Sequence, residues 1–389
     1  MAQHTGSPAF EYTLATTDVT ALQADIKSLG YLPLAPPRDY DATMRSLRAL
    51  LQQAIKVELG TIPPYMTALY TIRPEAPWQA AENLRSIVTE EMLHLVLAAN
   101  VLNAIGGEPK VYSRDIMMRY PGKLPFGIDA ATISLIHFSQ KAVEQGLRIE
   151  QPAAPDARHI VKAAQAKDDE TVENTLTIGE FYLLIESKLR AAVLAFGEAR
   201  VFCGDRARQV TLTEYYYDGG GGIVTVTDLQ SAVKAMTLIR DQGEGFSETV
   251  WTVNEPKPDE LVEVAHYYKF DELRLGRAYV LGDKPGHPSG EKIVAPYDAV
   301  YRTITDPTMA SYADTPEIAE HARAFDRVYC ELLRTVERAF AGEPNLLLAA
   351  VPTMMQLRDR AAQLVRNPMP GPHGSGLNAA PTFEFVPLP

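Results

Sequence analysis

The chain has 389 residues, of which 46% are hydrophobic and 22% charged, so it can bury a large core and has the composition of an ordinary globular protein. Its formal net charge of −12 argues against nucleic acid and anionic membrane surfaces as partners, because both repel a negatively charged protein. We see neither a basic-then-apolar leader nor an uninterrupted apolar run of the roughly twenty residues that a membrane span requires. The two cysteines, Cys203 and Cys330, match no zinc-site spacing, and we expect a reducing, cytoplasmic compartment.

The first helix is expected to follow an N-terminal extension and linker, residues 1–40. Helical organisation begins at Asp41, an expected N-cap, and apolar residues then recur at helical spacing up to about residue 60. Pro63 and Pro64 are expected to kink or interrupt this helix, because proline removes a backbone donor. Glu58 lies on the apolar stripe just before the prolines, where it is either a metal ligand or a solvated glutamate at a helix end.

The second helix is expected from Trp78 to Ile105, a run that contains neither Gly nor Pro. It is apolar over much of its circumference, which is typical of a helix buried in a bundle. Glu91 and His94 lie three residues apart, so on a helix they share one face and can reach one metal ion. A buried carboxylate and imidazole need partners, and a metal ion supplies them. The alternative is an ordinary exposed or core-edge pair.

A third strong helix is expected over residues 172–198, and it contains Glu180 and Glu186. Residues 209–227 then break the helical pattern with two β-branched and tyrosine-rich segments separated by glycines, which predicts an inserted β-hairpin. Two further amphipathic helices and a tail are expected beyond residue 282, packed on the preceding helices.

A second Glu-x-x-His motif, Glu263 with His266, is expected on a helix in the second half of the chain. Glu263 is either a metal ligand or a hydrogen-bond acceptor for a ligand imidazole. Glu244 lies between two glycines at the end of the preceding helix. The backbone could unwind there and bring the carboxylate inward, and a plain helix-ending turn is the alternative.

The position of each carboxylate along its helix axis indicates which carboxylates can share one site. Residues on antiparallel helices lie at equal height when their distances to the connecting turn match, because each residue advances the axis by about 1.5 Å. By this measure Glu58 lies at the height of Glu91, and Glu180 lies at the height of Glu244. The measure therefore favours Glu180 over Glu186 as a metal ligand.

Carboxylates and Glu-x-x-His motifs that point into a bundle are how ferritin-like proteins hold two iron or manganese ions. The sequence therefore predicts an all-α, ferritin-like four-helix bundle over residues 41–282, with extra helices from residues 283–389 and the inserted β-hairpin. Two iron ions are the expected cofactor, with manganese as the alternative, because a glutamate-rich set with two histidines suits them better than zinc. The expected ligands are Glu58, Glu91, His94, Glu180, Glu244 and His266, with Glu263 as a further candidate.

Several motifs together resemble one protein family. They are Glu58-Leu-Gly-Thr-Ile-Pro-Pro-Tyr65, Glu90-Glu-Met-Leu-His94, Thr177-Ile-Gly-Glu-Phe-Tyr182, Gln242-Gly-Glu-Gly245, His266-Tyr-Tyr-Lys-Phe270 and Ala379-Ala-Pro-Thr-Phe-Glu384. They resemble the ferritin-like domain of the iminophenyl-pyruvate dimer synthase family, which also occurs in the bisindole-forming enzymes of violacein and rebeccamycin biosynthesis. The resemblance implies an oxidative or imine-coupling enzyme of secondary metabolism.

The expected function is therefore a non-haem di-iron oxidase or oxygenase that uses O2 on a small, amino-acid-derived imine. Tyr65 and Tyr182 are the catalytic candidates, as pocket wall or radical carrier, with plain core packing as the alternative. Tyr65 follows Glu58 by seven residues, on the same helix face. Two other functions stay open: iron binding and oxidation without an organic substrate, and a metal-free interaction protein of the same fold. A homo-oligomer is compatible with each of them.

Overall fold

The computed structural model of the chain describes residues 34, 36–125, 128, 131–152, 176–215, 222–245, 249–252, 263–371 and 376–389. The N-terminal extension up to residue 33 and the centre of the expected hairpin, residues 216–221, lie outside these residues. The described part of the chain is predominantly helical and contains no β-strand, only isolated bridges. This agrees with the all-α prediction.

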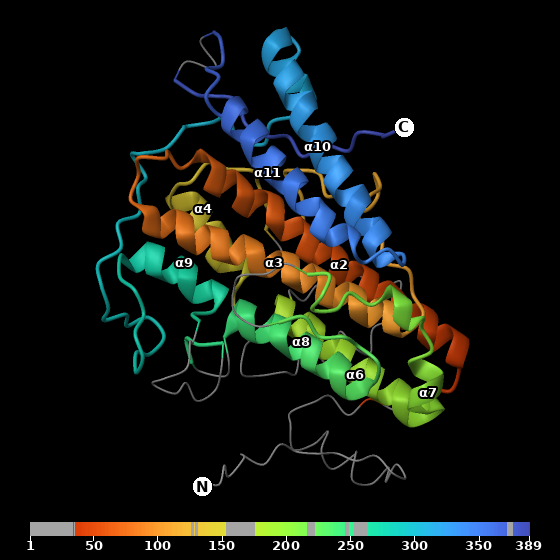
Figure 1. The fold of residues 1–389 in the computed structure, drawn as a ribbon. Coiled ribbons are helices and arrows are strands. Elements are labelled where there is room, and N and C mark those ends of the chain that lie inside the picture. Colours follow the sequence, from red (N-terminus) through yellow and green to blue (C-terminus); the bar gives the residue numbers. More distant parts are fainter. Residues whose placement is uncertain are drawn as a thin grey trace, which may run out of the picture.

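One half of the bundle consists of two long helices, α2 (Tyr40–Thr71) and α3 (Trp78–Ala104), which pack against each other (Figure 1). The N-cap of α2 is Asp39 rather than Asp41, and its carboxylate accepts a hydrogen bond from the Ala42 amide at 3.0 Å. Among the helices described, α3 alone is long and apolar enough to cross a membrane by length and composition. Its most apolar window is 89% buried inside the protein, as in the core helix of a bundle.

The prolines of α2 do not interrupt it, although we expected a kink or an interruption there. The helix continues through Pro63 and Pro64, and both side chains are buried. Pro64 cannot donate to the carbonyl of Gly60, and the hydroxyl of Tyr120 donates to this carbonyl instead, at 2.7 Å. A side chain from another part of the chain thus satisfies an acceptor that proline leaves open.

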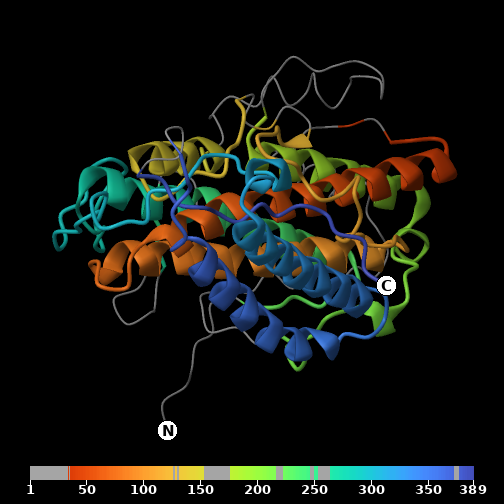
Figure 2. The same cartoon turned by 90° about the horizontal axis from the view of Figure 1, so that it is seen from above.

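The other half of the bundle is built from two broken helices. On one side α4 (Gln140–Ile149) is followed by α6 (Ile178–Phe196), and on the other α8 (Leu229–Glu244) is followed by α9 (His266–Leu275). The two members of each pair lie roughly in line in Figures 1 and 2. α6 packs on α2 and α8, α8 packs on α3, and α4 packs on α9, which closes the four-helix arrangement. Each break brings two helix ends into the bundle.

The expected β-hairpin at residues 209–227 is not supported. The described residues on either side of its centre contain no strand. A side chain holds the two segments where a hairpin would have a backbone ladder: the Asn100 amide donates to the carbonyls of Val210 (2.8 Å) and Val224 (3.0 Å). The first segment turns at residues 212–214, so the strand-like pattern reflects residues such as Val210 and Val224 held against α3 and not a pair of strands.

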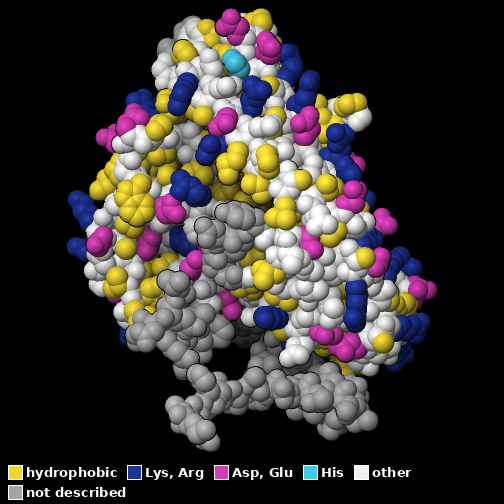
Figure 3. Space-filling model, in the orientation of Figure 1, with side chains coloured by type: hydrophobic (Ala, Val, Ile, Leu, Met, Phe, Trp, Pro, Cys, Tyr) yellow, Lys and Arg dark blue, Asp and Glu magenta, His cyan; other side chains and the backbone are white. Residues whose placement is uncertain are grey.

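The C-terminal region adds an antiparallel pair, α10 (Pro316–Phe340) and α11 (Leu346–Leu364), which covers α2 and α3 (Figure 2). Its buried side chains, including Phe340 and Leu357, belong to the same hydrophobic core as the bundle. The remaining short helices are α7 (Glu198–Val201), η2 (Arg206–Arg208) and η3 (Met309–Tyr312). On the face shown in Figure 3, acidic and basic side chains of the described residues are interspersed rather than gathered by sign.

Candidate metal centre

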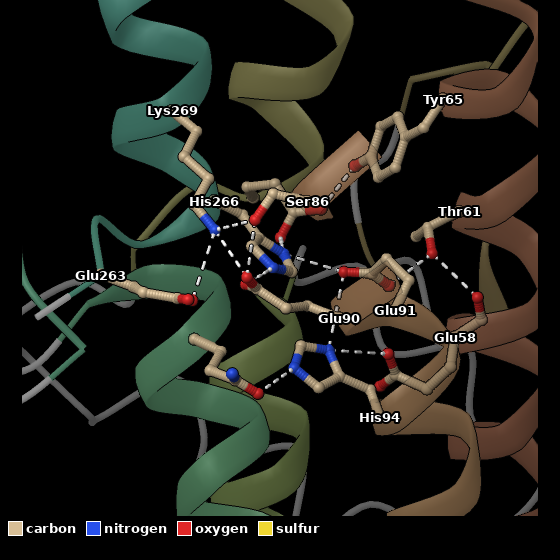
Figure 4. A network of polar contacts seen from close by, with 12 residues as sticks. Glu58, Thr61, Tyr65, Ser86, Glu90, Glu91, His94, Glu263, His266 and Lys269 are labelled. Carbon is tan, nitrogen blue, oxygen red and sulfur yellow. Dashed lines mark hydrogen bonds and ion pairs between the residues drawn. The ribbon is translucent and has the colours of Figure 1, made fainter. Parts of the chain in front are cut away.

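Two histidines and a glutamate converge in the interior of the bundle. Glu91, His94 and His266 are buried, and they offer ligand atoms that lie within 4.8 Å of one another, so they could hold a metal ion. The two imidazole rings stack with their centroids 5.3 Å apart. Glu91 and His94 come from one face of α3, as their spacing predicts, whereas His266 is the first residue of α9. The break between α8 and α9 thus brings His266 to the α3 pair (Figure 4).

Each imidazole turns its Nδ1 atom toward carboxylate oxygens. His94 Nδ1 lies 3.6 Å from Glu58 and 3.5 Å from Glu91. His266 Nδ1 lies 2.9 Å from Glu91 and 3.6 Å from Glu150. Both nitrogens face the same Glu91 oxygen, Oε1. Two ligand atoms about 2.1 Å from one ion and at right angles are roughly 3 Å apart, so these separations fit pairs of ligands that share a cation.

The other nitrogen of each imidazole, Nε2, contacts a side-chain oxygen. His94 Nε2 lies 3.1 Å from Gln242 Oε1, and His266 Nε2 lies 2.6 Å from Glu90 Oε2. Both partners are acceptors, so each Nε2 can keep its proton when a metal replaces the proton at Nδ1. Lys269 Nζ donates to the second oxygen of Glu90 at 2.7 Å.

Burial and crowding set the charge of the carboxylates. Burial, with the neighbouring Glu91 charge, raises the pKa of Glu58 to about 7 and also raises the pKa of Glu150. At Glu91, hydrogen bonds from His266 and His94 outweigh burial and hold its pKa well below the usual range.

The imidazoles respond in the opposite direction. Burial favours neutral His94, but its hydrogen bonds to Glu58 and Glu91 raise its pKa to about 9. Hydrogen bonds to Glu150, Glu90 and Glu91 likewise outweigh burial and raise the pKa of His266. Protons on the histidines therefore balance the acidic cluster when no metal is bound, and cations in the same place would do so too.

Both tyrosines that we expected to be catalytic contact the acidic cluster. The Tyr182 hydroxyl donates to Glu58 Oε1 at 2.6 Å, and the Tyr65 hydroxyl donates to Glu150 Oε1. Both side chains are buried, at 0% and 3% exposure. Burial, together with the Glu58 charge, raises the pKa of Tyr182 well above its usual value, so its hydroxyl keeps its proton. The tyrosines therefore take part in the polar network and are more than core packing.

Two expected ligands, Glu180 and Glu244, lie at the ends of the broken helices. Glu180 accepts a hydrogen bond from the Thr177 amide at 2.9 Å, as part of a capping box. Glu244 Oε1 accepts from the Gly179 amide at 2.5 Å and from the Thr177 hydroxyl at 3.1 Å. A Cβ at residue 179 would lie 2.0 Å from that oxygen, so glycine permits the contact. The two carboxylates do come together, and both cap α6.

The second Glu-x-x-His is not a helical pair, which corrects our expectation. Glu263 lies before the first turn of α9, where its carbonyl accepts from the Thr252 amide at 3.1 Å. Its carboxylate lies 3.9 Å from Lys269 Nζ, on the Glu90 side of the network (Figure 4). Hydrogen bonding with Glu263 also contributes to the lowered pKa of Glu90. The structure thus places Glu263 beside the groups that hold His266.

The sequence-based interpretation missed Glu150, Glu90, Gln242 and Lys269. Glu150 follows the last residue of α4, at the start of a stretch that appeared polar and exposed, but it is only 3% exposed. Two signals could have found Glu90 and Lys269. Glu90 precedes Glu91 in an otherwise apolar helix, and Lys269 follows His266 by one helical turn, where a cation would balance a buried acid.

A small pocket opens beside this cluster. Its lining consists of acidic, apolar and glycine residues with one histidine and one arginine: Glu58, Glu91, His94, Ile149, Glu150, Ile178, Gly179, Ile239, Arg240, Gly243 and Glu244. Three isoleucines form its apolar part. The pocket therefore places an apolar wall next to the residues that could bind a metal, but its volume of about 10 Å³ is only about that needed for one water molecule.

Comparisons with known proteins agree with this architecture. A solved structure of a ferritin-like protein from Caulobacter vibrioides is 22% identical, has a TM-score of 0.53, and aligns over 86% of this chain and 96% of that chain. At this identity the similarity concerns the fold alone. No curated protein matches the chain. The sequence model of the ferritin-like family matches residues 51–275, from α2 through α9, and the chain therefore belongs to the ferritin-like family.

Proposed function

We propose that the protein is a non-haem dinuclear metal oxidase or oxygenase whose ions are held by Glu58, Glu91, His94, Glu150 and His266. One observation carries this proposal: the Nδ1 atoms of both histidines face the same oxygen of Glu91, at 3.5 Å and 2.9 Å. Glu58 adjoins His94 and Glu150 adjoins His266, so the set divides into two halves around a shared carboxylate. In this proposal Glu150 stands in place of both Glu180 and Glu244, which we expected to be ligands.

The donor atoms fit iron, with manganese as the alternative. Carboxylate oxygens and imidazole nitrogens suit both ions, and the acidic cluster needs cations to hold all its carboxylates ionised. Two Fe(II) ions bound there would supply electrons for the reduction of O2.

The surrounding residues fix the donor atoms. Thr61 donates to Glu91 Oε2 at 2.7 Å, which leaves Oε1 directed at the histidines. Gln242 and Glu90 orient the imidazoles, and Lys269 keeps Glu90 ionised through its positive charge. Such outer partners fix the tautomer and the ring orientation of ligand histidines.

Tyr65 and Tyr182 hold protons beside the reacting groups. Their hydroxyls donate to Glu150 and Glu58, so each stabilises the negative charge of a ligand carboxylate. The pocket beside Glu58 and Glu150 has a volume of about 10 Å³, so its lining would have to move apart to admit a substrate. The tyrosines are therefore the proposed groups that keep these two ligand carboxylates charged and in position.

The proposed substrate is a small, amino-acid-derived imine of secondary metabolism, oxidised or coupled with O2 in the cytoplasm. Its support is the resemblance of the sequence motifs to the iminophenyl-pyruvate dimer synthase family. The apolar pocket wall of Ile149, Ile178 and Ile239 is compatible with the hydrocarbon part of such a molecule.

Oxygen uptake by the Fe(II)-loaded protein tests this function. We expect uptake to continue only when an imine, formed from ammonia and an aromatic 2-oxo acid, is added. The variants Tyr65→Phe and Tyr182→Phe should bind iron normally and consume O2 more slowly with the imine. Uptake that stops once the iron is oxidised, whether or not imine is present, would instead indicate an iron-oxidising protein. Absence of bound metal would leave a metal-free interaction protein.

A further inference from the structure

We propose that a second pocket, on the other side of α2 from the metal centre, binds a small carboxylate with an aromatic or aliphatic body. The pocket has a volume of about 350 Å³, and it lies between residues 114–120, residues 307–308 and the C-terminal segment 382–385. Binding sites for small molecules begin at roughly 300 Å³, so the cavity is large enough for such a ligand.

The charge of this pocket favours an anion. Arg114 and Arg119 both line it, and neither guanidinium forms an ion pair or hydrogen bond with a described residue. Arg114 lies over the Phe385 ring, 5.3 Å from its centroid. The pocket also contains Glu384, whose Oε1 accepts from the Met309 amide at 3.0 Å. Two cations thus face one acid in this pocket, although the protein as a whole has a net charge of −12. Guanidinium groups bind carboxylates by paired hydrogen bonds, so a carboxylate suits the pocket.

The rest of the pocket favours an apolar ligand body. Met117, Tyr120 and Phe383 line it and are each largely buried, with exposures of 5%, 8% and 2%. Such side chains provide apolar surface next to the guanidinium groups. A molecule that pairs one carboxylate with an aromatic ring or short hydrocarbon chain complements both parts.

Side chains of α10 hold the C-terminal wall of the pocket in place. The buried carboxylate of Asp326, on α10, accepts from the Thr382 hydroxyl at 2.6 Å and from the Glu384 amide at 3.1 Å. Phe383 packs edge-on against Phe325, with ring centroids 4.9 Å apart. The segment therefore forms a fixed wall alongside α10 (Figure 2).

Backbone strain gathers at the same pocket. Phe383 has a φ of +51°, and Asp306, which directly precedes the pocket residue Pro307, has a φ of +49°. They are the only two non-glycine residues with a positive φ in the described part of the chain. A bulky residue such as Phe383 rarely adopts this conformation, whereas aspartate adopts it more readily, so the strain lies at Phe383, and strained positions tend to occur where a ligand is held.

This pocket is separate from the metal centre. Its floor residue Tyr120 bonds the Gly60 carbonyl, and a Cβ on Gly60 would lie 3.1 Å from Met118 Sδ. Gly60 is two residues after Glu58, which places it about 200° around the helix. The pocket thus packs on the face of α2 opposite the metal ligands, so its occupancy does not depend on the proposed oxidase function.

Titration calorimetry on the full-length, metal-free protein tests the proposal with phenylacetate and its neutral analogue phenylacetamide. We expect saturable binding of phenylacetate, and binding of the amide that is weaker by about tenfold or more, because the amide lacks the charge that strengthens a hydrogen bond. Arg119→Gln should weaken phenylacetate binding by a similar factor, and Arg114→Gln should also weaken it.

Two variants serve as matched controls. Arg323→Gln changes an exposed arginine of α10, and Arg240→Gln changes the arginine of the pocket beside the metal centre, so both should leave phenylacetate affinity unchanged. Melting curves establish that every variant is folded. The proposal is overturned if phenylacetate shows no saturable binding at millimolar concentration, if the amide binds equally well, or if Arg240→Gln weakens binding and Arg119→Gln does not.

Discussion

The two halves of the bundle bring residues to the metal centre by different means. α2 and α3 are continuous helices, and the regular helical spacing along them places Glu58, Glu91 and His94 on facing surfaces. The other half is interrupted twice, and its contributions come from helix ends: Glu150 follows α4, and His266 begins α9. Residue spacing therefore positions one half of the centre, and tertiary contacts between helix ends position the other.

The interrupted half compensates for its breaks with specific polar contacts. Glu244 at the end of α8 bonds the first turn of α6, and Glu90 on α3 bonds His266 at the start of α9. Lys269, one turn further along α9, bonds Glu90 as well. Each contact joins a helix end to another element, so each should matter more than a comparable contact within a continuous helix.

Removal of a histidine should have the largest effect in both halves. We expect His94→Ala and His266→Ala each to lower iron affinity by more than about 100-fold, since loss of a direct ligand should exceed the effect usual for an outer partner. Competition against a chelator measures the affinity. If either variant binds iron as tightly as the unaltered protein does, that histidine is not a ligand and the corresponding half of the centre is wrong.

Glu150 and Glu180 distinguish the two possible origins of the carboxylate on the broken side. We expect Glu150→Gln to lower iron affinity by about 100-fold, whereas Glu180→Gln keeps the affinity and loses about 1 kcal/mol of unfolding free energy, as for a weakened helix cap. Iron competition and chemical denaturation give the two quantities. The reverse pattern, with iron lost from Glu180→Gln alone, would restore the ligand set predicted from the sequence.

The partners behind the two imidazoles should have smaller effects. Gln242→Ala frees the His94 ring and Glu90→Gln weakens the support of His266, and each should reduce iron affinity by about 10-fold to 100-fold. We expect the larger loss for Glu90→Gln, because it also removes the charge that Lys269 balances. Equal affinities in both variants and the unaltered protein would show that the rings are held by packing alone.

Packing on the two halves can be compared with a matched pair of glycines. A Cβ on Gly146, in α4, would lie 2.5 Å from the buried Phe270 ring of α9, whereas a Cβ on Gly60, in α2, would meet the flexible ends of Leu124 and Met118 at 3.1 Å. Gly146→Ala should lower the unfolding free energy by about 1–2 kcal/mol, because the contact with Phe270 destabilises the protein more than the higher helix propensity of alanine stabilises it.

The control for this experiment is Gly60→Ala, which we expect to change stability by less than about 1 kcal/mol, since helix propensity offsets the mild contact. Denaturant titration measures both. If the two alanines destabilise the protein equally, α4 and α9 are not packed as closely as the structure shows.

The same division explains what could be predicted from the sequence. The all-α fold, the ferritin-like bundle and the Glu91–His94 pair follow from apolar periodicity and helical spacing, and they lie in the continuous half. The continuity of α2 through its prolines could not be foreseen, because it relies on the distant Tyr120 hydroxyl. Glu150 was missed because its burial depends on packing between α4 and α9, which local polarity does not reveal. The hairpin was expected because segments packed on α3 have the alternation of strands.

The number of Fe(II) ions that the metal-free protein binds under anaerobic conditions tests the dinuclear centre most directly. Spectroscopic titration should show an end point at two ions per chain, and His94→Ala and His266→Ala should each abolish that end point. An end point at one ion would mean that the two halves of the bundle form a single mononuclear site. No binding at all would contradict a metal centre between them.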